Sequence, residues 1–382
     1  MPRKLHSRRW ILGSLTGLTC LAPLSAWAFQ ALNNSSYRPG HIAAGKAVVQ
    51  KHISVDLHSH PGIFFVNTEQ PTDFEKTVMT KTGGTFVPKT MADMMDGGLT
   101  ACVMSTVADM PILNVNMEKG KVFAARKFRE GESWKNFQAQ NQKMAAIIKG
   151  YDCVVARTSN DIKVAKASGR LAVIMSTEGA SYLDHDLGRL EVLYDKGYRN
   201  IQLVHYHVNQ IGDIQTEVPV YNGLSAFGKE VVQEMARLGL VIDLAHASED
   251  TVNDVAGLTQ VPLVVSHSGL CSDRRCHPRY QTRSQAITIA QTGGIVGLAP
   301  SGFLNRSFED YINEIDYFAQ EIGVDHVALG TDMDANYKPV FDNYADLYLI
   351  PTALIARGYN ETDIAKIMGG NFMRVFEQIT RK

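Results

Sequence analysis

Ionisable side chains recur at the ends of six short apolar runs in this sequence. They are His58 with His60, Glu178, His205 with His207, His246, His267 and Asp332. In VDLHSH, His58 and His60 stand two positions apart, so in a strand both side chains point to the same side. Converging histidines and carboxylates with little sulfur are typical of a zinc-type hydrolytic site, in which a carboxylate can bridge two ions.

Each of these residues alone also has a structural explanation. A single histidine at a strand end is more often hydrogen-bonded than metal-bound, Glu178 could cap the following helix, and Asp332 could lie in a turn. These explanations would have to hold at six places together. The pattern therefore favours one site built from all of them.

Short β-branched apolar runs alternate with helical patterns after residue 40. The predicted strands cover 53–58, 100–106, 171–177, 200–206, 240–246, 262–268, 294–300 and 326–332. Continuous apolar runs are typical of strands buried on both faces of a parallel arrangement, and apolar spacing predicts helices over 224–239 and 308–323. Eight such units predict an α/β fold, a closed (β/α)8 TIM barrel whose strands end on one shared active-site face. An open doubly wound sheet is the alternative, but no glycine-rich phosphate loop follows the first run.

The N-terminal 28 residues are predicted to be a signal peptide rather than part of the barrel. A basic region with Arg8 and Arg9 precedes a short, glycine-broken apolar stretch and a small-residue site ending at Ala28. This segment resembles a twin-arginine export signal. We expect cleavage after Ala28 and a periplasmic product; an uncleaved membrane anchor is the alternative.

Residues 29–382 are predicted to form a single catalytic barrel domain. Irregular insertions at about 62–99 and 107–150 are expected to form the pocket walls, with 110–150 helical in pattern. The 382 residues are 45% hydrophobic and 20% charged with net charge −1, which argues against nucleic acid or a polybasic membrane patch as partners. A disulfide between Cys271 and Cys276 could cross-link one loop, but the few cysteines do not make a disulfide scaffold.

Six segments carry a family resemblance. They are 223–248, VPLVVSHSG at 261–269, HPR at 277–279, GGIVGL at 293–298, LGTDMD at 329–334 and IAKIMGGNFMRVF at 364–376. Together they resemble the renal or membrane dipeptidases, zinc metallopeptidases of family M19 in the amidohydrolase-like barrel class. The last segment is especially specific, because no general catalytic requirement would produce GGNFMRVF.

The resemblance implies a pair of zinc ions (Zn2+) bridged by a hydroxide. By their positions in the family pattern, His58 and His60 hold the first ion, and His246 and His267 hold the second. Glu178 would bridge the two ions.

The resemblance also implies roles for three further side chains. His205 matches the histidine that stabilises the tetrahedral oxyanion, and Arg279 matches the arginine that binds the terminal carboxylate of the substrate. Asp332 matches the acid and base beside the bridging hydroxide.

The sequence departs from the family pattern in two places. The family writes His-x-Asp at the first motif, whereas His60 stands here and removes one negative charge from the metal pair. The run after His205 also differs, which places His207 and Asn209 near the pocket. The loop before Arg279 is about one residue longer than expected, so either arginine in 274–275 could share its task.

These features predict a zinc-dependent dipeptidase that hydrolyses dipeptides, including those with a D-residue at the second position. Another binuclear metal hydrolase, such as an N-acyl-amino-acid amidase, lactonase or phosphotriesterase, is the alternative suggested by His60. A binding protein that has lost the reaction is a third hypothesis. A homodimer is expected for this kind of barrel.

Overall fold

The computed structural model describes residues 37–116, 121–271 and 276–381, all within one unit, Ser36–Lys382. The predicted signal peptide lies outside the described residues, and so do both arginines of 274–275. Among the described residues, no helix has both the length and the apolar character needed to cross a membrane.

A ring of parallel strands forms the centre of the described fold. The strands are β1 (Val55–Ser59), β2 (Ala101–Val107), β6 (Ala172–Glu178), β7 (Tyr198–Gln202), β8 (Val241–Asp243), β9 (Val264–Ser268), β10 (Ile295–Leu298) and β11 (Val327–Leu329). Neighbours pair in the order β2-β1-β11-β10-β9-β8-β7-β6, and β2 pairs with β6 to close the ring. The predicted (β/α)8 barrel is therefore confirmed. A short β5 (Val154–Val155) pairs with the start of β6.

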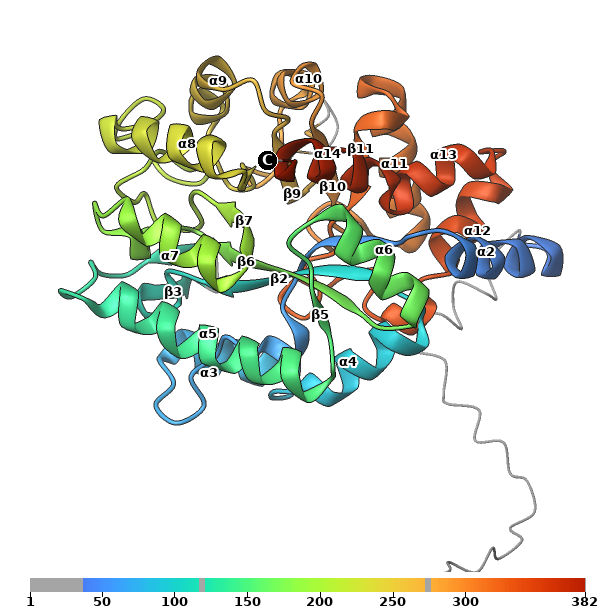
Figure 1. The fold of residues 1–382 in the computed structure, drawn as a ribbon, viewed down its shortest axis with the longest axis horizontal. Helices are drawn as coiled ribbons and strands as arrows, with labels where there is room; N and C mark the ends of the chain where they lie inside the picture. Colours follow the sequence, from blue (N-terminus) through green and yellow to red (C-terminus); the bar gives the residue numbers. More distant parts are fainter. Residues whose placement is uncertain (1–36, 117–120, 272–275, 382) are drawn as a thin grey trace, which may run out of the picture. The chain divides into compact units, whose positions relative to one another are not determined.

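Helices surround the strands (Figure 1). They are α2 (Pro39–Lys51), α3 (Asp73–Thr82), α4 (Val87–Asp96), α5 (Glu132–Gly150), α6 (Ser159–Ser168), α7 (Gly188–Lys196), α8 (Ala226–Leu238), α9 (Glu249–Leu258), α10 (Arg283–Gln291), α11 (Phe308–Ile322), α12 (Leu349–Ala356), α13 (Glu361–Ala365) and α14 (Asn371–Thr380). The two helices predicted from apolar spacing are α8 and α11. Helix α8 ends at Gly239, whose φ of 76° is the left-handed cap conformation that glycine adopts without strain.

The amino ends of the strands are filled by apolar side chains. One buried cluster joins the first residues of six strands: Val55, Ala101, Ala172, Val241, Val264 and Ile295. Phe372 and Phe376 of α14 pack into the same cluster. Burial of these apolar surfaces stabilises the barrel at about 25 cal/mol per Å2. The ionisable residues lie at the opposite ends of the strands.

The insertion predicted at 62–99 contains α3 and α4, but the helical prediction for 110–150 is wrong in its first part. There β3 (Leu113–Asn116) and β4 (Lys121–Ala124) pair in antiparallel fashion, and α5 begins only at Glu132. The alternation in LNVN has the period of a strand, and Leu113 is buried in an apolar cluster against Val122. This alternation over four residues indicates a strand, which a single helical pattern over 110–150 obscures.

Glu314 of α11 is a half-buried carboxylate beneath the loop that follows β9. It accepts hydrogen bonds from the backbone N of Leu270 (3.1 Å) and from Nδ2 of Asn305 (2.9 Å). Burial raises the pKa of Glu314 from 4.5 to about 7, although these hydrogen bonds oppose the shift. The folded chain therefore keeps a proton that the unfolded chain has released. The free energy of unfolding should fall as pH rises from about 4.5 to about 7.

We expect Glu314→Gln to remove most of this pH dependence, because glutamine keeps an acceptor and carries no charge. At roughly 1.4 kcal/mol per pKa unit, the variant should retain up to about 3 kcal/mol that the wild type loses. Urea unfolding at pH 5 and pH 8 measures the difference, with Glu230→Gln on the exposed surface of α8 as the control. An equal decline in wild type and Glu314→Gln would contradict this assignment.

Candidate metal centre

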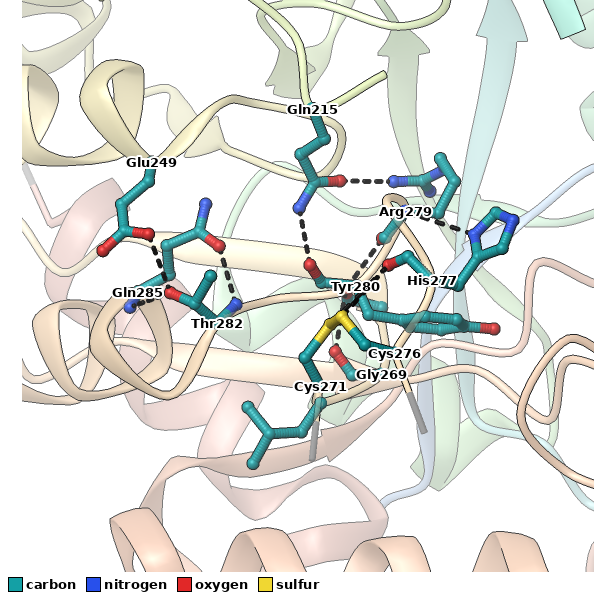
Figure 2. Close-up of a disulfide and its surroundings, with 12 residues drawn as sticks. Gln215, Glu249, Gly269, Cys271, Cys276, His277, Arg279, Tyr280, Thr282 and Gln285 are labelled. Atoms are coloured by element: carbon teal, nitrogen blue, oxygen red, sulfur yellow. Dashed lines mark hydrogen bonds between the residues drawn. A yellow bond between two sulfur atoms is a disulfide. The ribbon is translucent and has the colours of Figure 1, made fainter. Parts of the chain in front are cut away.

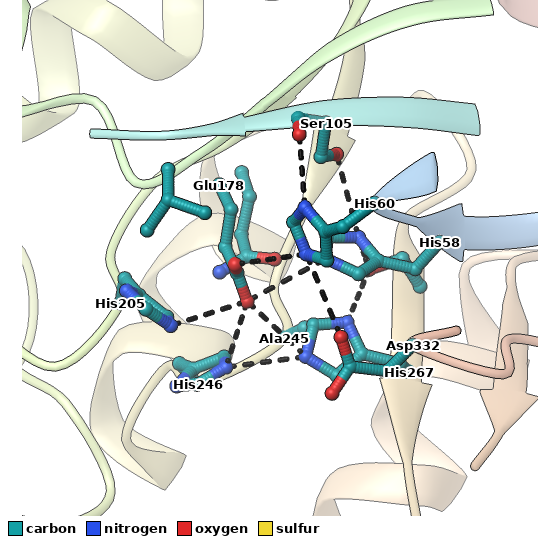
Figure 3. A network of polar contacts seen from close by, with 12 residues as sticks. His58, His60, Ser105, Glu178, His205, Ala245, His246, His267 and Asp332 are labelled. Carbon is teal, nitrogen blue, oxygen red and sulfur yellow. Dashed lines mark hydrogen bonds and ion pairs between the residues drawn. The ribbon is translucent and has the colours of Figure 1, made fainter. Parts of the chain in front are cut away.

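The ionisable residues predicted from the sequence meet at the carboxyl ends of the barrel strands (Figure 3). Three of them belong to strands or end them: His58 in β1, Glu178 at the end of β6 and His267 in β9. The others follow their strands closely: His60, His205, His246 and Asp332. All except Asp332 are buried. The parallel barrel therefore collects side chains from distant parts of the sequence on one face.

The first group of donors comprises His58, His60 and Glu178. The Nε2 atoms of the two histidines lie 3.0 Å apart. Nε2 of His58 is 3.5 Å from Oε1 of Glu178, and Nε2 of His60 is 3.3 Å from its Oε2. Each side chain offers one donor atom, and these atoms lie within 4.8 Å of one another.

The second group shares Glu178 with the first and adds His246 and His267. The Nε2 atoms of these histidines lie 3.1 Å apart. They are 3.3 Å and 3.5 Å from Oε1 of Glu178, respectively. Here too the donor atoms lie within 4.8 Å of one another. Oε1 of Glu178 therefore faces His58, His246 and His267, and Oε2 faces His60.

Hydrogen bonds at the other ring nitrogen orient two of these imidazoles. Nδ1 of His60 lies 2.9 Å from the carbonyl O of Ser105, which can only accept, so His60 carries its proton on Nδ1. Nδ1 of His267 lies 3.0 Å from Oγ of Ser266. The Nε2 lone pair of His60 is therefore directed at the shared carboxylate, as metal-binding histidines require.

The charges around the centre reinforce this arrangement. Burial raises the pKa of Glu178, but the facing His205 and His58 outweigh burial and hold it well below its usual value. Burial lowers the pKa of His246 and of His267 well below 6.5, and nearby cationic groups add to this effect. Neutral imidazoles at His246 and His267 beside an ionised carboxylate suit a divalent transition metal. Burial lowers the pKa of His58, but Glu178 and Asp332 outweigh burial and raise it to about 9, so a metal ion bound there would displace a proton.

Two buried aspartates hold the strand ends that carry the donors. Oδ1 of Asp56 accepts from the backbone N of His58 (3.1 Å) and of Thr331 (2.9 Å), which joins β1 to the segment after β11. Oδ1 of Asp243 accepts from the backbone N of Ala245 (3.1 Å) and of Ser266 (2.9 Å), which joins β8 to β9. Each aspartate thereby fixes the backbone beside two of the ionisable residues. The sequence signal for both is a carboxylate inside an apolar run, VDLH and VIDLAH.

His205 faces the shared carboxylate, and Asp332 faces the imidazole of His60. Nε2 of His205 lies 3.3 Å from Oε1 of Glu178, and Oδ1 of Asp332 lies 3.5 Å from Nε2 of His60. Burial raises the pKa of Asp332 to about 6, although nearby cationic groups, among them Arg279, oppose this shift. The side chain of Asp332 is still 20% exposed, so it can meet a bound molecule.

Sequence reasoning missed Asp109, which contacts His205 directly. Its Oδ1 lies 2.6 Å from Nδ1 of His205, and its Oδ2 accepts from the backbone N of Tyr206 at 3.0 Å. Burial lowers the pKa of His205, but Asp109 and Glu178 outweigh burial and raise it. Asp109 follows β2 just as the other ionisable residues follow their strands, and this spacing was the available signal.

The sequence profile of the membrane dipeptidases, peptidase family M19, matches residues 42–382 of this chain. The chain belongs to this family.

Three proteins resemble the chain in sequence or in fold. The dipeptidase verJ of Clonostachys rogersoniana is 28% identical over 232 residues, which are 59% of this chain and 60% of that protein. The probable dipeptidase PvdM from Pseudomonas aeruginosa superposes with a TM-score of 0.74 at 18% identity, over 90% of this chain and all of that one. A metallopeptidase from Rhodobacter sphaeroides, liganded with a phosphinate mimic of the dipeptide L-Ala-D-Ala, has a TM-score of 0.71 at 21% identity, over 86% and 100% of the chains. The match thus spans about three-fifths of the length of the dipeptidase verJ. The two solved structures have the same fold as this chain.

In this membrane dipeptidase family member, Arg279 lies in the loop after β9 (Figure 2). Its guanidinium lies 5.8 Å from the ring centre of Tyr206, and that ring packs edge-on against His246 at 4.9 Å. A disulfide joins Cys271 to Cys276 in the same loop, which answers the question that the sequence left open. The arginine is therefore held near the metal-donor groups by a cross-linked loop.

The two residues expected near the pocket after His205 differ in their surroundings. His207 is half-buried and lines a cavity of about 450 Å3 together with Tyr206 and Phe123. Asn209 uses its polar atoms within the loop, donating to the carbonyl O of Leu203 (2.8 Å) and accepting from the backbone N of Ile211 (2.9 Å). His207 therefore faces a cavity, whereas Asn209 stabilises the turn.

Proposed function

We propose that this chain is a zinc dipeptidase with two metal ions, acting on dipeptides that include those with a D-residue at the second position. The observation that carries the proposal is the pair of overlapping donor groups that share Glu178. Family membership and a structural neighbour that binds an L-Ala-D-Ala mimic support the choice of substrate class.

The five donors suit two divalent ions. His58 and His60 would hold one ion, His246 and His267 the other, and Glu178 would bridge them. When bound, such ions polarise a carbonyl oxygen and lower the pKa of water towards about 7. His60 leaves the pair with only one carboxylate ligand, which increases its net positive charge relative to the family pattern.

Three side chains of the chain itself would complete the reaction. His205, with Nδ1 held by Asp109, would donate from Nε2 to the substrate oxygen as negative charge develops there, an effect worth about 3–4 kcal/mol. Asp332 would accept a proton from the attacking water and pass it to the leaving amine, for which a pKa of about 6 is suitable. Arg279 would bind the free carboxylate of the dipeptide.

We further propose that residues 29–382 form the single catalytic domain and that the mature protein is periplasmic. The disulfide between Cys271 and Cys276 agrees with an oxidising compartment. Cleavage after Ala28 and a homodimer remain predictions from the sequence.

A second binuclear hydrolase activity, on an N-acyl-amino acid or a lactone, is favoured by one observation. His60 occupies the position of a carboxylate in the family pattern and adds no negative charge to the site. Its Nε2 lies 3.0 Å from Nε2 of His58. The resulting charge would stabilise anionic transition states of other carbonyl compounds equally well.

The proposal is tested with purified mature protein, whose metal content is measured before activity. We expect about two zinc ions per chain, hydrolysis of several dipeptides, loss of activity with a chelator and recovery with zinc. N-acyl-amino acids, lactones and phosphotriesters are assayed beside the dipeptides. Two bound zinc ions without turnover of any dipeptide would overturn the substrate assignment, and turnover of another class would identify the alternative.

A further inference from the structure

We infer that Gln215 is a positioning residue: it orients Arg279 toward the carboxylate of the substrate without neutralising the charge of Arg279. The inference rests on the proposed dipeptidase function and assigns a determinant of its specificity for free carboxylates. It is carried by the contacts that Gln215 makes with two separate loops, of which Figure 2 shows those with Arg279 and Tyr280.

The backbone of Gln215 is tied to the segment that carries His246. Its N–H donates to the carbonyl O of His246 at 2.9 Å, and the preceding Ile214 forms an antiparallel bridge with Ala247. The start of the Gln215 side chain is therefore fixed relative to a proposed metal ligand.

The side-chain amide of Gln215 uses both of its ends on the Arg279 loop. Oε1 accepts from Nη1 of Arg279 at 2.8 Å, and Nε2 donates to the carbonyl O of Tyr280 at 3.1 Å. Because the carbonyl can only accept, the amide has one orientation that satisfies both contacts, with its oxygen at the guanidinium. Gln215 thus connects the arginine to the metal-donor segment through two directional hydrogen bonds.

The neutrality of this partner matters as much as its geometry. A carboxylate at the same place would form a bidentate ion pair with Arg279 and compete with the substrate. The amide accepts one N–H of Arg279 and brings no negative charge to it, and the Tyr206 side chain, which also hydrogen-bonds Arg279, brings none either. Tyr206, whose ring lies 5.8 Å from the guanidinium, is also uncharged. Gln215 therefore orients Arg279 while preserving its attraction for an anion.

Two variants of nearly the same size separate these contributions. Gln215→Met removes both hydrogen bonds, and Gln215→Glu keeps an acceptor but adds a charge. For dipeptides with a free carboxylate, we expect KM to rise about tenfold in Gln215→Met, the effect of losing one hydrogen bond to a charged group, with kcat within about twofold. Gln215→Glu should raise KM further. The corresponding C-terminal dipeptide amides, which offer Arg279 no charge, should show unchanged KM in both variants.

Gln233→Met at an exposed position of α8 is the matched control, and circular dichroism with thermal unfolding verifies the fold of every variant. The inference is overturned if wild type hydrolyses dipeptides and the variants change KM equally for dipeptides with a free carboxylate and for dipeptide amides, or change neither. The dipeptidase function stands in that case. If wild type hydrolyses no dipeptide, the proposed function fails and the inference fails with it.

Discussion

Replacing Glu178 with glutamine is expected to abolish tight binding of both metal ions. Glu178 is the carboxylate common to the two donor groups and faces His58, His60, His246 and His267 at 3.3–3.5 Å. A neutral amide would leave each ion with imidazole donors alone. Changes to groups that only orient metal ligands already reduce affinity about 10–100-fold, so loss of this ligand should cost at least ~100-fold at each position.

Metal content after dialysis, together with zinc titration calorimetry, measures this effect. Glu230→Gln on the exposed surface of α8 makes the same chemical change and should keep its metal. A Glu178→Gln protein that retains two ions with unchanged affinity would show that Glu178 does not bridge a metal pair.

Replacing Asp332 with asparagine is expected to lower kcat by about 10²–10⁴-fold while the metal content stays unchanged. The variant removes the group that would transfer the proton and leaves the five proposed ligands in place. Asparagine suits the backbone here, because Asp332 has φ of 52° and asparagine tolerates this left-handed conformation. The backbone N of Asp332 also keeps its hydrogen bond to the carbonyl O of His58, so the fold should be preserved.

Steady-state kinetics on a hydrolysed dipeptide, with metal analysis of the same samples, tests this prediction. Asp195→Asn on the exposed surface of α7 is the control. Unaffected turnover in Asp332→Asn would exclude Asp332 as the proton carrier. A wild-type protein that binds dipeptides but turns none over would favour the binding-protein hypothesis.

The barrel was predictable because its strands are buried on both faces and therefore appear as uninterrupted apolar runs. In β2, for example, every residue from Ala101 to Val107 is buried. The hairpin of β3 and β4 was not predicted, since its strands have only four residues each and a helix follows soon after. Short elements of this kind depend on contacts with the rest of the fold more than on their own sequence.

The ionisable residues of the site were predictable from their position at strand ends, but their supports were not. Asp109 contacts His205 across 96 positions of the sequence, and Gln215 reaches Arg279 across 64. Asp109 offers one local signal, its place just after β2, whereas nothing local distinguishes Gln215 from an ordinary polar residue in a loop. Their importance arises only when the barrel closes and brings the loops together.

Asp56 and Asp243 anchor the proposed ligands to the hydrogen-bonded framework of the barrel rather than to its variable loops. Each carboxylate accepts hydrogen bonds from backbone amides of two neighbouring segments. One of these amides belongs to the residue directly before Asp332, for Asp56, or before His267, for Asp243. Insertions such as the β3–β4 hairpin can consequently be lengthened, shortened or replaced while the chemistry stays where it is. In this architecture, new substrates become accessible by remodelling the rim alone.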